Sequence, residues 1–102
     1  MAAKIHKYDI GTKFNFTILD ESGTVIDLSV ATFKELRFSK PDGSVVTKTP
    51  TLTTDGTDGK VYYVTILNDL DQVGDWKVQF KTDLPAWQGY SDIGKFKVYE
   101  NI

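Results

Sequence analysis

The chain has 102 residues, with 12 Lys and Arg against 14 Asp and Glu, a net charge of −2, and no cysteine. We expect one domain, residues 1–102, able to bury its own core. The composition excludes a disulfide framework, a Cys-ligated zinc site and a thiol nucleophile. It offers no Lys/Arg stripe for nucleic acid, no apolar run near the ~20 residues that span a bilayer, and no signal-peptide h-region. We therefore expect no nucleic-acid or membrane partner, and synthesis in the cytoplasm without Sec export.

Alternating apolar residues predict strands from the beginning of the chain. Phe14, Phe16 and Ile18 alternate with polar residues, which is typical of a strand with one buried face. The segment Asp20–Gly23 then has the composition of a turn. A second, short strand is expected at 25–28.

The next two expected strands each contain an irregularity. The apolar phase of segment 32–39 slips between Phe33 and Leu36, which predicts a β-bulge or two short strands that meet there. After a Pro-Asp-Gly-Ser turn, segment 45–54 contains Pro50, which cannot donate to a ladder. That segment is therefore expected to form an edge strand.

The second half of the chain continues the same pattern of short strands and turns. The expected elements are a turn at 55–59, a strand at 60–67, a helical turn at 68–73 capped by Asn68, a strand at 76–81, an irregular stretch at 82–91 and a strand at 95–99. No segment longer than a turn has the apolar spacing of an amphipathic helix. About seven short strands at this spacing predict an all-β, immunoglobulin-like sandwich of two antiparallel sheets.

An acidic turn followed by an aromatic residue, at 71–76, is typical of a strand that enters a sandwich from a corner. Trp76, Val78 and Phe80 then share one face of the strand. The expected core comprises Phe14, Phe16, Ile18, Leu28, Leu36, Phe38, Val61, Tyr63, Leu70, Trp76, Val78, Phe80, Phe96 and Val98.

No group of residues indicates catalysis, a cofactor or a metal. His6, the single histidine, has no partner in the pattern and is expected to be a solvated side chain. The Asp and Gly residues of 55–59 could contribute to a calcium loop, but they also suit a hairpin turn for backbone reasons. We expect the turn, and no enzyme activity.

One segment, 84–90, has the composition of a binding surface. Trp87 lies between Pro85 and Gly89, with Tyr90 beside it, in an expected loop. Such an aromatic residue is a common interface anchor or a platform for a sugar ring. The alternative is that Trp87 folds back and covers the open end of the sandwich.

The order of these patterns resembles the immunoglobulin-like domain of tailed-phage virion proteins, of the type found at the N-terminus of baseplate upper proteins. The similarity covers about residues 8–98. It depends on the combination Gly23-Thr-Val-Ile-Asp-Leu-Ser-Val-Ala-Thr32, Lys40-Pro-Asp-Gly43, Asp58-Gly-Lys-Val-Tyr-Tyr63 and Gly74-Asp-Trp76. Baseplate upper proteins continue into a stalk or fibre, whereas this sequence stops at Ile102. A fragment of a longer chain and a small stand-alone virion protein both remain open.

The resemblance implies a non-enzymatic structural protein of a bacteriophage virion. Such a protein would attach a tail or baseplate fibre, or decorate or connect the capsid, as an oligomer in a symmetric assembly with other virion proteins. Its motifs contain no catalytic or binding residues that could be transferred to this chain. The alternative from the residues is a carbohydrate-binding module that uses Trp87 and Tyr90. A third hypothesis is an immunoglobulin-like spacer of a bacterial surface protein.

The expected partner-contact surface follows from the sheet edges. Pro50 and Lys48 would guard the edge formed by 45–54, so partners are expected on the edges near the termini and on the adjacent aromatic loop. The residues chosen on this basis are Tyr8, Trp87, Tyr90 and Tyr99.

Overall fold

A computed structural model describes residues 4–85, 87–91 and 93–102. These residues form eight strands and no helix, which confirms the all-β prediction. In chain order the strands are β1 (Lys13–Thr17), β2 (Phe33–Ser39), β3 (Val45–Lys48), β4 (Thr51–Leu52), β5 (Lys60–Val64), β6 (Gly74–Leu84), β7 (Trp87–Tyr90) and β8 (Gly94–Val98).

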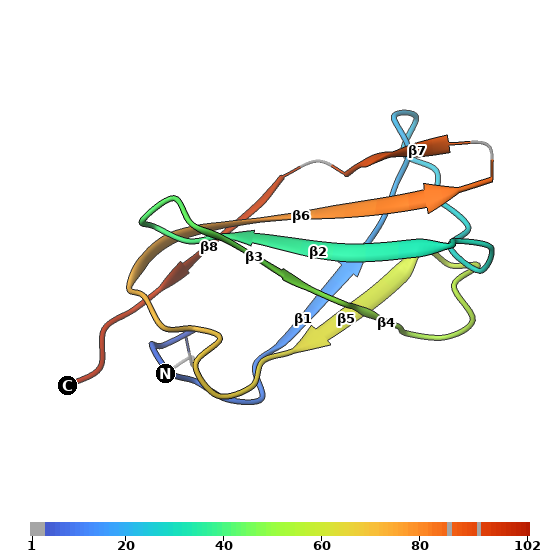
Figure 1. Cartoon of the computed structure of the whole chain (residues 1–102). Coiled ribbons are helices and arrows are strands. Elements are labelled where there is room, and N and C mark those ends of the chain that lie inside the picture. The colour runs from blue at the N-terminus through green and yellow to red at the C-terminus, as the bar shows by residue number, and fades with distance from the viewer. Residues whose placement is uncertain (1–3, 86, 92) are drawn as a thin grey trace.

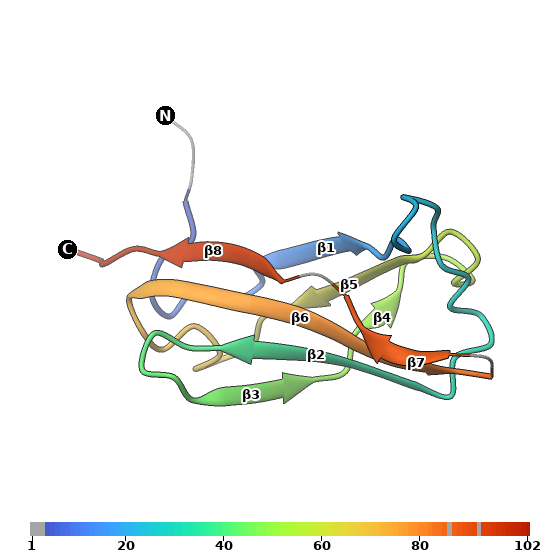
Figure 2. The same cartoon turned by 90° about the horizontal axis from the view of Figure 1, so that it is seen from above.

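The strands form two antiparallel sheets that pack as a sandwich (Figure 1). The smaller sheet has the order β1-β5-β4, and the larger has the order β3-β2-β6, with β7 and β8 both paired to the remaining edge of β6. Strand β8 pairs with the first part of β6 and β7 with its last part. The molecule is elongated, 48 × 28 × 24 Å, with the beginning of the described chain and its C-terminus at one end and β7 toward the other (Figures 1 and 2).

The core lies between the two sheets, as the alternating pattern predicts. The ten buried aliphatic and aromatic side chains of the described residues all belong to the expected core: Ile18, Leu28, Leu36, Phe38, Val61, Leu70, Trp76, Val78, Phe80 and Val98. The other four expected core residues, Phe14, Phe16, Tyr63 and Phe96, are half-buried. Their rings contact one another or the buried Phe38 and Trp76, with centroids 4.8 to 6.4 Å apart. Aromatic packing therefore dominates the end of the core near the termini.

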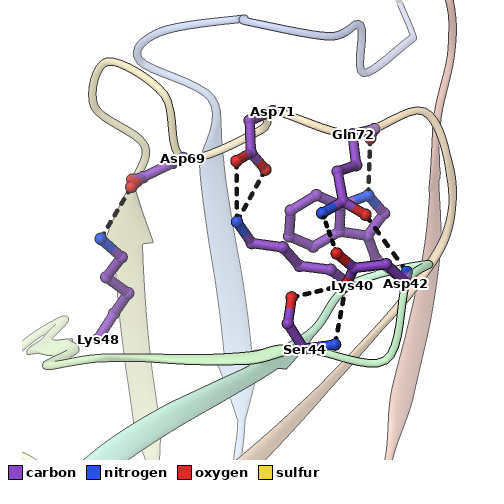
Figure 3. Close-up of polar contacts among 8 residues, drawn as sticks. Lys40, Asp42, Ser44, Lys48, Asp69, Asp71 and Gln72 are labelled. Atoms are coloured by element: carbon purple, nitrogen blue, oxygen red, sulfur yellow. Dashed lines mark hydrogen bonds and ion pairs between the residues drawn. The ribbon is translucent and has the colours of Figure 1, made fainter.

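The corner before β6 is held by side-chain bonds to the β2–β3 turn (Figure 3). The Nζ atom of Lys40 contacts both carboxylate oxygens of Asp71, at 2.9 and 3.0 Å. Gln72 accepts a bond from the Asp42 backbone N–H at 3.3 Å and donates its Nε2 to the Asp42 carboxylate at 2.8 Å. The indole Nε1 of Trp76 donates to the Gln72 carbonyl at 3.0 Å. The acidic turn thus positions the indole, as expected of a sandwich corner.

Asp69 links the two sheets at the same end. One carboxylate oxygen lies 2.8 Å from the Nζ atom of Lys48 on β3, and the other accepts from the Tyr63 hydroxyl on β5 and from the Ile66 N–H. Burial and the bond to the charged Asp69 raise the pKa of Tyr63 well above its usual range. Tyr63 is therefore a neutral donor between the sheets at physiological pH.

Two expected features in the first half are wrong. Residues 25–28 form no strand, because Val25 makes only a single bridge with Leu19 and the Leu28 N–H donates elsewhere, to Gly56. Strand β2 contains no bulge and pairs with β6 without interruption. The apparent phase slip arises because Phe33 lies on the outer face of the sheet, with the Lys81 Nζ 5.6 Å from its ring.

Segment 45–54 is not one strand. The chain changes sheet at the buried Pro50, so that β3 belongs to the larger sheet and β4 to the smaller. The missing N–H of proline makes this a suitable place to leave a ladder. Each part does lie at a sheet edge, as predicted.

The stretches at 68–73 and 82–91 also differ from expectation. Asn68 has a positive φ of 67° and occupies a turn, so it caps no helix. Residues 82–84 and 87–90 are regular: β6 continues to Leu84, and β7 pairs with it, because Pro85 lies in a turn and interrupts neither ladder.

Candidate binding groove

One side of the sandwich is open between two strand edges. Within residues 4–85, 87–91 and 93–102, strand β1 pairs only with β5, while β7 and β8 pair only with β6. Between β7 and β8, Ser91 continues the edge: its N–H donates to the Phe80 carbonyl at 2.8 Å, and its hydroxyl accepts from the Phe80 N–H at 3.0 Å. The edges of the two sheets therefore face each other without a strand between them.

A groove follows this open side, and we call it the edge groove. Its larger part, about 750 Å³, is lined by apolar side chains that include Ile18, Leu19, Phe80, Leu84 and Trp87. A smaller part of about 360 Å³ shares the first three of these residues and continues along β1 and β8. A concave, largely apolar surface with a few polar groups is typical of a binding site.

Trp87 lies in the wall of the edge groove. It pairs with Leu84, on the face of β7 that is turned toward the core, and 43% of it is exposed. Its indole covers Gly89, where a Cβ atom would lie only 2.4 Å from the Trp87 Cζ2 atom. Glycine at 89 is therefore required for the indole to lie flat. Trp87 partly covers the open end of the sandwich and also contributes to the groove.

Tyr90 lines the same groove from its edge. It lies three residues after Trp87 and therefore on the opposite face of β7, where the Lys81 Nζ is 5.6 Å from its ring. The two aromatic residues belong to a strand and not to a loop, and they form no common flat platform. Each contributes a different wall to the groove, and Tyr90 is 51% exposed.

An acidic turn forms the rim of the groove. Asp20 and Glu21 both line it and are exposed. The Asp20 Oδ1 atom accepts bonds from the Ser22 hydroxyl at 2.7 Å, the Ser22 N–H at 2.9 Å and the Thr24 N–H at 3.0 Å. These bonds, first of all that of the Ser22 hydroxyl, lower the pKa of Asp20. The rim is negatively charged at physiological pH.

Tyr8 and Tyr99 lie at the other end of the molecule, near the termini. The segment before Tyr8 pairs with the end of the chain: the Lys7 N–H donates to the Tyr99 carbonyl, and the Tyr99 N–H to the Ile5 carbonyl, both at 2.9 Å. We call this pairing the terminal seam. Tyr8 is 52% exposed and Tyr99 is half-buried. The four predicted contact residues thus form two separate aromatic surfaces, and β7 does not lie beside the last residues of β8.

His6 belongs to the terminal seam and is not simply solvated. It is half-buried, its Nδ1 atom lies 3.0 Å from the Glu100 carbonyl oxygen, and its ring centroid is 6.0 Å from that of Tyr99. The geometry indicates a structural contact.

The carboxylates of the 55–59 turn bind backbone and hydroxyl groups. Asp55 accepts from the N–H and hydroxyl of Thr57, and Asp58 from the Lys60 N–H and the Thr54 hydroxyl. Within the described residues, no group of three or more His, Cys, Asp or Glu side chains could hold a metal ion.

The same part of the chain contains no helix long and apolar enough to cross a membrane.

The sequence pattern did not identify the acidic rim or the floor of the groove. One signal was present: Leu19 directly follows Ile18 and breaks the alternation, and it is 48% exposed in the structure. Ile93, 54% exposed, is a second apolar residue on this open side.

In comparisons with known proteins, no family model and no curated protein matches this chain.

Proposed function

We propose that this protein is a non-enzymatic structural component of a tailed-phage virion that acts by protein–protein attachment through the edge groove. In this role it would be an immunoglobulin-like module located in the particle. It would attach a tail or baseplate fibre, or decorate or connect the capsid, after synthesis in the host cytoplasm. The sequence resemblance supports the phage assignment.

The observation that carries the attachment role is the edge groove itself. It combines apolar walls, two half-exposed aromatic residues and two strand edges that pair with no further strand among the described residues. Large aromatic residues in a concave apolar surface are typical anchors of protein interfaces. Free strand edges add backbone donors and acceptors that a partner can pair with.

The test is to locate the protein in purified particles of the phage that encodes it. Mass spectrometry should find the chain in intact virions at a stoichiometry set by the particle symmetry, and cross-linking should connect lysines near the groove to neighbouring virion proteins. Absence of the chain from washed particles would refute the assignment.

A carbohydrate-binding module is the second candidate function. Trp87 lines the groove with Asp20 and Glu21, and carboxylates accept hydrogen bonds from sugar hydroxyls. A glycan array followed by fluorescence titration tests this candidate, with Trp87→Ala as the variant. Saturable binding that the variant loses would favour it over attachment to proteins. A flat titration across the array would eliminate it.

A further inference from the structure

The smaller sheet has an uncovered edge where it borders the edge groove. An immunoglobulin sandwich has four strands in this sheet, and the first strand of the chain forms the edge beside the second. In this chain β1, β5 and β4 take the places of the second, fifth and fourth strands of that fold, because the chain passes between the two sheets in the same order. Among the described residues, no strand lies beside β1 in the place of the first (Figure 1).

The segment that precedes β1 is held at the terminal seam and does not cover this edge. The Tyr8 N–H donates to the Leu70 carbonyl at 2.7 Å. His6 forms a parallel bridge with Tyr99, beside the end of the larger sheet. The free edge of β1 is therefore open to a strand from another chain.

The backbone of β1 presents every second residue to the free edge. The Ile18 N–H donates to the Gly59 carbonyl at 2.8 Å, so the even-numbered residues of β1 turn their N–H and C=O groups toward β5. Asn15 and Thr17 therefore turn theirs away from β5, and both residues line the smaller part of the groove. An extended segment can pair with such groups as a further strand of the sheet.

The edge groove has the length of a short strand. The lining residues on β6 run from Val78 in the smaller part to Leu84 in the larger part. At a rise of ~3.3 Å per residue, this distance along β6 corresponds to about 20 Å. The floor between these residues is apolar, with Ile18 and Phe80 in both parts of the groove. An extended segment of about six residues, with alternate apolar side chains turned inward, fits such a floor.

The rim of the groove favours a basic residue at one end of such a segment. Asp20 and Glu21 line the groove and form no ion pair within the described part of the chain, where no Lys or Arg lines the groove. Lys81 contacts the Tyr90 ring from the outer face of the larger sheet, and Lys95 is exposed on the same face. Neither lysine lies between the two sheets, so a Lys or Arg of a partner would be the complement of the acidic rim.

We propose that an extended segment of another protein binds in the edge groove as an added strand beside β1. Its backbone pairs with Asn15 and Thr17, and its alternate apolar side chains pack on the floor of the groove and on Trp87. A Lys or Arg at one end lies beside Asp20 and Glu21. The inference rests on the proposed function, because it names the partner of the same groove.

The first experiment selects ligands for the full chain from a displayed library of random linear peptides. The enriched sequences should have apolar residues at alternate positions, with Lys or Arg at one end. Trp87→Thr should bind the selected peptides roughly thirtyfold or more weakly, as expected for an aromatic anchor. Tyr8→Asn is the matched control, because it removes a similarly exposed ring from the other end of the molecule, at a left-handed position that Asn tolerates. The absence of any enriched peptide, or equal losses in the two variants, would overturn the proposal.

The second experiment tests the backbone pairing with N-methylated forms of a selected peptide. A strand turns only every second N–H toward one neighbour, so methylation of one alternate set of amides should weaken binding roughly tenfold or more, and methylation of the other set clearly less. Amide hydrogen exchange at Asn15 and Thr17 should slow in the complex. Equal losses from the two sets, or unchanged exchange at both residues, would refute an added strand beside β1.

A charge exchange tests the polar part of the contact. Glu21→Lys should weaken binding of a selected peptide roughly tenfold or more, since it places like charges together, and a peptide with Glu in place of its basic residue should regain much of the affinity. Asp75→Lys is the matched control, because it makes the same change of charge at an exposed position at the other end of β6. An equal loss with the control would mean that only net charge matters and would refute the position of the basic residue.

Sedimentation velocity of the chain alone distinguishes a foreign segment from a second copy. The wild type should stay monomeric at the concentrations of the titrations. Self-association that Trp87→Thr abolishes would make a second copy the occupant and overturn the proposal. Virions that contain the chain, together with a groove that binds no peptide, would refute the added strand but not the proposed function. A chain that binds peptides but is absent from virions would refute the proposed function alone.

Discussion

Truncation of Trp76 should be the most damaging single change in the core. The side chain is 1% exposed, its ring packs on Phe96 with centroids 5.7 Å apart, and its indole N–H donates to the Gln72 carbonyl. Burial of a large aromatic removes ~150–250 Å² from water, which at ~25 cal/mol per Å² corresponds to ~4–6 kcal/mol. Measured truncations of buried aromatic residues cost ~3–5 kcal/mol.

We therefore expect Trp76→Ala to lower the free energy of unfolding by ~3–5 kcal/mol, a large part of the ~5–15 kcal/mol typical of a domain. Urea denaturation followed by far-UV circular dichroism measures this loss. Trp76→Phe should cost less, because it keeps a ring against Phe96 and loses mainly volume and the bond to Gln72.

Trp87→Ala is the matched control, because it removes the same side chain from a position that is 43% exposed. Its loss should be clearly smaller than that of Trp76→Ala. Equal losses from the two truncations, or a Trp76→Ala loss below ~1 kcal/mol, would mean that the indole of Trp76 is not the centre of the core.

Three further changes test other parts of the fold. Gly59→Ala should lower the free energy of unfolding by at least ~2 kcal/mol, because φ is +67° and a Cβ would lie 2.9 Å from two backbone carbonyl oxygens. Gly23→Ala is the control: φ is +87° but the space around the residue is open, so thermal unfolding should show a smaller loss of stability. Hydrogen bonds from the Ser44 hydroxyl and N–H, and then from Gln72, lower the pKa of Asp42 from 3.8 to about 2. These bonds therefore stabilise the folded state fully above pH 3.8, and their contribution disappears as the pH falls toward 2. Urea midpoints of the wild type and Asp42→Asn should accordingly differ at pH 5 and converge near pH 2. If the carboxylates of residues 55–59 only accept hydrogen bonds within the turn, neither calcium nor EDTA should change the melting temperature. A rise of several degrees with calcium would contradict this, because a ligand that binds the native state stabilises it.

The buried face of each strand could be predicted because it depends on local alternation. Trp76, Val78 and Phe80 point into the core for this reason, and so do Leu36 and Phe38 on the neighbouring strand. A strand with one buried face must place an apolar side chain at every second position, whichever strand it pairs with.

Features that depend on distant partners could not be predicted. From the sequence alone, Phe33 breaks the apolar alternation; in the structure it lies on the outer face, near Lys81 of a neighbouring strand. Residues 82–91 look irregular until β7 pairs with the end of β6. The edge groove exists only because the end of β1 lies opposite Trp87, almost seventy residues later in the chain, so its rim and floor have no signature of their own apart from the unexpected apolar Leu19.

The terminal seam has a consequence for the order in which the domain is completed. The Asn101 amide donates to the Lys7 carbonyl, a pairing of residues 94 positions apart. At a synthesis rate of ~5–20 residues per second, the segment Ile5–Lys7 waits roughly 5–20 s for its partner. During that interval Tyr8 and the lysines around it have no fixed arrangement relative to Tyr99. The surface that carries Tyr8 and Tyr99 is therefore the last of the domain to form, and a nascent chain cannot present it to a neighbour before its own fold is closed.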